Sequence, residues 1–142
     1  MTSETIQIST IVGASPAVVW HAYTSPDAIV KWNTASEDWH TTAATVDLRE
    51  GGNFCSRMEA KDGSMGFDFE GTYTKIIPEN CIEYTFGDRV ARIDFDCSQP
   101  GQVTVTITFD SEDSHSIEQQ RSGWQSILDN FRQYVESGDN RG

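Results

Sequence analysis

The chain has 142 residues, of which 37% are hydrophobic, and its 22 acidic and 10 basic residues give a formal net charge of −12. This charge argues against nucleic acid and anionic membrane surfaces as partners, because both attract basic proteins. No apolar run approaches the roughly 20 residues of a membrane-spanning helix, and the N-terminus lacks a signal-peptide pattern. We therefore expect one cytoplasmic domain over residues 1–142, without membrane insertion and with a core at about 4–136.

Residues 4–13 alternate between apolar and polar side chains, which predicts a strand. Two Ser-Pro pairs follow, Ser15-Pro16 and Ser25-Pro26. Serine is a good N-cap and proline fits the first helical position, so each pair predicts the start of a short helix. The residues expected to point inward from these helices are Val19, Tyr23, Ile29 and Trp32.

The segment 33–45 is small and polar except for Trp39, which indicates a loop or an irregular edge. Residues 46–52 resemble a strand that runs into a turn at Gly51-Gly52. Alternating segments separated by turn residues then predict strands over residues 53–60, 65–76, 81–87, 91–97 and 103–109.

The last patterned segment predicts an amphipathic helix, with Ser116 and Gln119 as a capping box. Gly123 lies inside it, although glycine costs roughly 1 kcal/mol relative to alanine in a helix. We expect this glycine to permit a close approach to a strand or to the N-terminal helices, so that Gly123→Leu destabilises the fold and Trp124 plugs a cavity or forms its wall. The apolar stripe of this helix is Ile117, Gln120, Trp124, Ile127, Leu128, Phe131 and Val135.

These elements predict an α+β helix-grip fold. A curved antiparallel sheet of about six or seven strands, polar on one face, must cover its apolar face. The C-terminal helix is the one element long enough to do so, and the two short helices after the first strand close one end.

The order of elements and several motifs resemble the START-related helix-grip superfamily, which includes polyketide cyclases and Bet v-type proteins. More narrowly, the chain is similar to the C-terminal domain of the activator of heat-shock protein 90 ATPase. The resemblance covers about residues 4–136. Its motifs are the Ser-Pro-capped helix, Trp32, the Gly51-Gly52 turn before Phe54, the F-x-G-x-Y run of Phe69, Gly71 and Tyr73, and the Gly123-Trp124 pair.

The resemblance implies a cavity between sheet and helix that often holds hydrophobic small molecules, but it implies no single activity. We expect a domain that binds a hydrophobic or aromatic small molecule. A co-chaperone or stress-response interaction domain, with a chaperone as partner, is one alternative. An enzyme of cyclase or hydrolase type is another, and we expect a monomer or a weak dimer.

The candidate ligand-binding residues form a ring-rich inward set. A filled core is the competing interpretation for most of them, whereas Trp32 and Trp39 lie beside the irregular segment where a cavity mouth is expected. The set is Trp32, Trp39, Phe54, Met58, Phe67, Phe69, Tyr84, Trp124, Leu128 and Phe131.

No catalytic constellation, metal site or cofactor motif is evident. Asp68 and Glu70 are expected to face water, within reach of Arg57 across the sheet. Tyr73 and Tyr84 either orient a ligand through their hydroxyls or end a core pair with a wet tip. His21 and His40 are the candidate bases, and Cys55, Cys81 and Cys97 lack the spacing of a zinc site or a disulfide framework.

Overall fold

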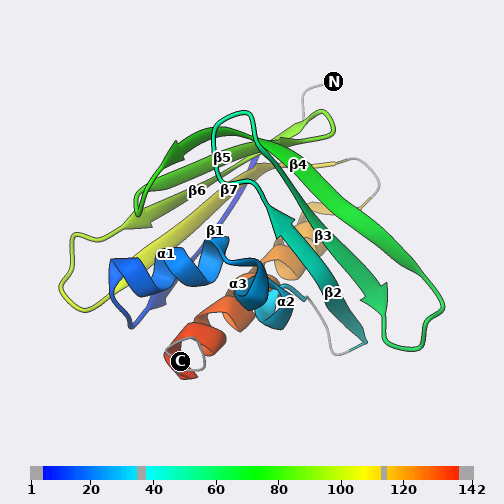
Figure 1. Ribbon diagram of the computed structural model, residues 1–142, viewed down its shortest axis with the longest axis horizontal. Coiled ribbons are helices and arrows are strands. Elements are labelled where there is room, and N and C mark those ends of the chain that lie inside the picture. Colours follow the sequence, from blue (N-terminus) through cyan, green and yellow to red (C-terminus); the bar gives the residue numbers. More distant parts are fainter. Residues whose placement is uncertain (1–4, 35–37, 113–114, 138–142) are drawn as a thin grey trace.

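The computed structural model describes residues 5–34, 38–112 and 115–137, and the expectations for residues 1–4, 35–37, 113–114 and 138–142 lie outside this description. Seven strands form one antiparallel sheet in the order β1-β7-β6-β5-β4-β3-β2. The sheet curls over helix α3, with α1 and α2 on the same side (Figure 1), which confirms the predicted helix-grip fold. The elements are β1 (Thr5–Val12), α1 (Pro16–Thr24), α2 (Pro26–Trp32), β2 (Trp39–Val46), β3 (Asn53–Ala60), β4 (Gly66–Ile77), β5 (Cys81–Phe86), β6 (Arg89–Asp96), β7 (Val103–Asp110) and α3 (Ile117–Ser137).

The two short helices begin at the predicted prolines, but their serines act differently. The Ser15 hydroxyl accepts a hydrogen bond from the Val18 amide at 3.4 Å and so caps α1. The Ser25 side chain makes no capping bond. Its backbone N–H instead donates to the His21 carbonyl, because Ser25 ends α1 as well as starting α2.

Residues 33–45 were expected to form a loop or an irregular edge, and strand β2 rules out a loop over residues 39–45 and agrees with the irregular edge. Residues 39–46 pair with β3, from Trp39 opposite Ala60 to Val46 opposite Phe54. The pattern was missed because β2 is an edge strand with a register shift between Thr41 and Ala43, so its side chains do not alternate cleanly between buried and exposed.

The expected strand over residues 46–52 is wrong, because β2 ends at Val46, where that strand was predicted to begin. The Gly51-Gly52 turn itself is present. Gly51 has φ +86°, a conformation that favours glycine, and a Cβ on Gly52 would lie 2.1 Å from the Asp47 carbonyl oxygen.

The remaining strands follow the predicted alternation. In β7, Val103, Val105, Ile107 and Phe109 are buried, while the threonines between them are half-buried on the other face. This strand pairs with β1 on one side and β6 on the other, and its inward side chains belong to the apolar core.

Helix α3 spans the apolar face of the sheet. Its start has the predicted capping box, in which the Ser116 hydroxyl accepts from the Gln119 amide at 3.1 Å and the Gln119 side chain accepts from the Ser116 amide at 3.3 Å. Leu128, Phe131 and Val135 are almost fully buried beneath it. Of the helices in the described ranges, none combines the length and the apolar character needed to cross a membrane.

Candidate functional site: a ring-lined cavity under the sheet

A cavity of about 490 Å³ lies between α3 and the concave face formed by β2 to β5 and β7. This volume falls within the roughly 300–1,000 Å³ of small-molecule sites. Nine of the ten sequence-predicted site residues line it: Trp32, Trp39, Phe54, Met58, Phe67, Phe69, Tyr84, Trp124 and Leu128. That these residues contact a ligand stays a prediction.

Phe131, the tenth candidate, does not line the cavity. Its side chain is fully buried, and its ring packs edge-on against Tyr23 and Trp32 at centroid distances of 5.2 and 4.9 Å. The helical spacing placed Phe131 on the correct face of α3, but it lies one turn beyond Leu128, where the core is filled.

Trp39 and Phe67 form one end of the cavity, which we call the mouth. Their ring centroids are 5.8 Å apart, and Phe67 is 48% exposed. Exposure falls along β4, because Phe69 is half-buried and Tyr73 is only 7% exposed. The cavity therefore runs from the mouth toward a closed end at Tyr73.

Trp124 forms one wall of the cavity. Its ring stacks on Phe109 with a centroid distance of 3.9 Å and an interplanar angle of 10°. Its other neighbours, Phe69 and Phe86, meet it at 6.4 and 5.8 Å. These contacts fix the indole, so the cavity has a rigid aromatic surface on the helix side.

The expectation that Gly123 permits a close approach is wrong. A Cβ built at this glycine meets no atom within 4 Å, and the residue borders the cavity. A close approach between neighbouring strands occurs instead at Gly71, where a Cβ would lie 2.3 Å from the Thr85 carbonyl oxygen and 2.8 Å from the Phe54 ring. Gly123 instead leaves space beside Trp124.

Three tyrosines also line the cavity: Tyr23 from α1, Tyr73 from β4 and Tyr84 from β5. Burial raises the pKa of Tyr73 to about 12. Burial also raises the pKa of Tyr23, with a further contribution from Tyr73, and that of Tyr84, with contributions from both other tyrosines. All three hydroxyls stay protonated at neutral pH.

Neither candidate histidine belongs to the cavity. His21 is exposed on α1, and His40 lies on a separate, more polar surface groove of about 770 Å³. No Asp, Glu, His, Lys, Arg or Cys is among the lining residues that the described ranges contribute. The described lining therefore offers no carboxylate or imidazole for acid–base chemistry.

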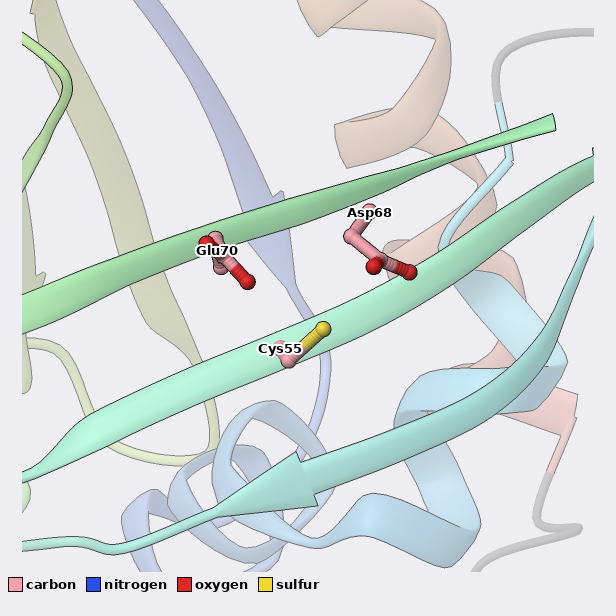
Figure 2. A group of neighbouring side chains, drawn as sticks. All are labelled: Cys55, Asp68 and Glu70. Carbon is pink, nitrogen blue, oxygen red and sulfur yellow. The ribbon is translucent and has the colours of Figure 1, made fainter.

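The acidic residues of β4 face away from the cavity, as predicted. Asp68 and Glu70 are exposed, and Arg57 reaches Asp68 at 3.5 Å across the sheet. Cys55, Asp68 and Glu70 each offer one potential metal-ligand atom, and these three atoms lie within 4.8 Å of one another (Figure 2). Burial and both carboxylates raise the pKa of the Cys55 thiol, which disfavours the thiolate that a metal needs.

Several cavity residues were missing from the predicted set. Tyr73 shares a face with Phe69 under the period-2 alternation, and this signal was sufficient to include it. Asn33, Thr45 and Val46 also border the cavity. Thr45 and Val46 were missed because β2 was not recognised as a strand, whereas Asn33 is the C-cap of α2.

The sequence pattern of the family described as "Activator of Hsp90 ATPase homolog 1-like protein" matches residues 13–136. The chain belongs to this family. Among solved structures, the AHSA1-like protein from Aeromonas hydrophila is 45% identical, with 96% of this chain and 95% of that chain covered and a TM-score of 0.90.

Two further solved structures have the same fold as this chain over most of its length. A Cytophaga hutchinsonii protein is 40% identical over 97% of this chain and 96% of that chain, with a TM-score of 0.81. A Chromobacterium violaceum protein is 26% identical over 94% and 98% of the two chains, with a TM-score of 0.83. The comparison with curated proteins finds no match. Family membership agrees with the START-like helix-grip resemblance and assigns no ligand.

Proposed function

We propose that this AHSA1-like protein binds a hydrophobic or aromatic small molecule between its sheet and α3. The observation that carries the proposal is the cavity of about 490 Å³, whose lining is dominated by rings and holds no charged side chain among the described residues. Such a lining favours an apolar ligand, because removing apolar surface from water contributes roughly 25 cal/mol of binding free energy per Å².

The test is a fluorescence titration with N-phenyl-1-naphthylamine, a neutral probe that brightens in apolar surroundings. We expect saturable binding, together with a rise in melting temperature because the probe binds the folded state. Gly123→Leu places a side chain into the space beside Trp124, so it should weaken binding by about tenfold or more, roughly 1.4 kcal/mol.

Ser122→Leu is the matched control, because the same change is made one residue away at an exposed position of α3. Its probe affinity should equal that of the unmodified protein. The absence of saturable binding contradicts the proposal. Equal binding by Gly123→Leu contradicts it as well, since the probe would then bind exposed apolar side chains outside the cavity, such as Met65 or Ile11.

A co-chaperone role is the second candidate, and the observation that favours it is the family description, which names activation of a chaperone ATPase. The test is the ATPase rate of purified Hsp90 with and without this protein. Stimulation that persists in Gly123→Leu would assign the function to the surface and not to the cavity. The cyclase or hydrolase alternative receives no comparable support, because the described lining offers no imidazole or carboxylate.

A further inference from the structure

The closed end of the cavity carries hydroxyl groups from two layers of the fold. Tyr73 and Tyr84 lie directly opposite each other on β4 and β5, and each is only 7% exposed. The Phe54 ring packs against both, at centroid distances of 5.2 and 4.7 Å. Tyr23 reaches the cavity from α1, on the helical side. The three tyrosines thus border one end of a mainly apolar space.

None of these hydroxyls has a hydrogen bond to another group within residues 5–34, 38–112 and 115–137. Two other buried polar side chains of the protein, Trp32 and Gln120, are paired. The Trp32 indole donates to the Ala22 carbonyl at 2.8 Å, and the Gln120 amide donates to three carbonyls at 2.9 to 3.4 Å. Buried polar groups of native proteins are nearly always satisfied, so these hydroxyls point to a partner within the cavity.

The charge of the surroundings limits what that partner can be. The described lining has no cation to balance an anion and no carboxylate to balance a cation. The raised pKa values of the three tyrosines have burial as their largest cause, which shows that this end of the cavity disfavours negative charge. A neutral hydroxyl or carbonyl satisfies tyrosine hydroxyls without such a cost.

We propose that the cavity selects a neutral, largely aromatic molecule with one hydroxyl or carbonyl at its inner end, and that Tyr23, Tyr73 and Tyr84 hold this group by hydrogen bonds. This inference rests on the proposed function and defines its ligand class. Phe67 at the mouth precedes Tyr73 by six residues on β4, so about 20 Å of strand is available to an elongated ligand.

Three probes of nearly the same shape test the inference: 2-naphthol, 2-methylnaphthalene and 2-naphthoate, each measured by displacement of N-phenyl-1-naphthylamine. We expect 2-naphthol to bind about tenfold more tightly than 2-methylnaphthalene, because its hydroxyl replaces the methyl group against the tyrosines. The anionic 2-naphthoate should bind more weakly than either.

Tyr73→Phe and Tyr84→Phe, alone and combined, remove the hydroxyls and keep the rings. The double variant should lose most of its preference for 2-naphthol over 2-methylnaphthalene, because only the Tyr23 hydroxyl remains, while its affinity for 2-methylnaphthalene is unchanged or higher. Tyr134→Phe on α3 is the matched control, since Tyr134 does not line this cavity, and it should keep the tenfold preference, within about twofold. Melting curves confirm that each variant is folded.

Three outcomes overturn the inference while leaving the proposed function intact. They are equal affinity of the unmodified protein for 2-naphthol and 2-methylnaphthalene, tightest binding by 2-naphthoate, and an equal loss of both neutral probes in the double variant, which would give the tyrosines a packing role alone. Failure of N-phenyl-1-naphthylamine itself to bind is a different result, and it contradicts the proposed function together with the inference.

Discussion

The concave face of the sheet has two halves of different character. Under β1, β6 and the part of β7 away from Ile107, many aliphatic side chains are almost completely excluded from water, and we call this region the filled half. It includes Ile6, Val12, Val103 and Val105 of the sheet and Val135 of α3. Under β2 to β5, the inward side chains are mainly rings, and the cavity lies between them and α3. We call this region the cavity half.

The difference follows from side-chain shape and from the reach of α3. Branched aliphatic side chains interdigitate closely, so the sheet and the helix approach each other in the filled half. Rings such as Phe54 and Phe69 pack against one another along the sheet, at 5.8 Å, and leave space above them. Trp124 stands at the boundary, stacked on Phe109 and bordering the cavity. The lesson is that one apolar face can build stability in one part and a binding site in another.

The largest effect should come from the same truncation made in each half. Phe131→Ala removes a fully buried ring and should lower the free energy of unfolding by about 3–5 kcal/mol. Phe67→Ala, at the half-exposed mouth, should cost less than about 1 kcal/mol. Urea denaturation of both variants measures the contrast, and equal losses would remove the distinction between the halves.

A second contrast concerns two tryptophans. Trp32→Phe leaves the Ala22 carbonyl without its 2.8 Å donor in a buried site, which should cost about 1–3 kcal/mol. Trp124→Phe breaks no hydrogen bond recorded among the described residues and keeps a ring on Phe109, so a loss of about 1 kcal/mol or less is expected. Thermal and urea unfolding should rank Trp32→Phe as the more damaging change. The reverse order would show that stacking at the boundary matters more than buried pairing.

Replacing two glycines by alanine should change the stability of the fold in opposite directions. Gly123→Ala adds a Cβ where no atom lies within 4 Å and improves helix propensity, so it should stabilise the fold by about 1 kcal/mol. Gly71→Ala forces a Cβ against the Thr85 carbonyl oxygen and should destabilise it. Denaturation midpoints of the two variants provide the check. A destabilised Gly123→Ala would indicate that another element packs closely against Gly123, contrary to the structure.

The smallest expected change in stability comes from a pH-dependent hydrogen bond between Glu136 and Gly13, at the end of the filled half. Glu136 accepts the Gly13 amide at 2.8 Å, which is the largest cause of its lowered pKa, and Arg132 adds to the shift. A lowered folded-state pKa stabilises the fold above the unfolded value of roughly 4.3, and this contribution is lost as the pH falls through the folded value.

Glu136→Gln should therefore be less stable than the unmodified protein at pH 7, by less than about 1 kcal/mol because the carboxylate is partly exposed. The difference should shrink below about pH 4. Unfolding measured at pH 7 and pH 3 tests this expectation. An unchanged difference at the two pH values would assign the effect to the neutral hydrogen bond rather than to the charge.

The sequence predicted the elements with strong local signals. Ser15-Pro16 located α1, the alternation of Val103 through Phe109 located β7, and the Ser116–Gln119 pair located the start of α3. Nine of the ten candidate site residues border the cavity for a related reason, because period-2 and period-3.6 patterns identify the inward face of an element. Patterns of this kind do not show where along an element the filled core ends and the cavity begins. Phe131 was therefore included among the candidate site residues although it lies in the filled core.

What the sequence determined by itself was which side chains turn inward and the order of elements that makes a sheet close over a helix. Only the tertiary structure decided that β2 forms at all, since an edge strand depends on pairing with β3 and not on its own pattern. It also decided that Gly123 faces open space while Gly71 lies close to the neighbouring strand. The physical reason is common to these cases: pairing, filling and clearance are set by elements distant in the chain, and local periodicity does not measure the distance between them.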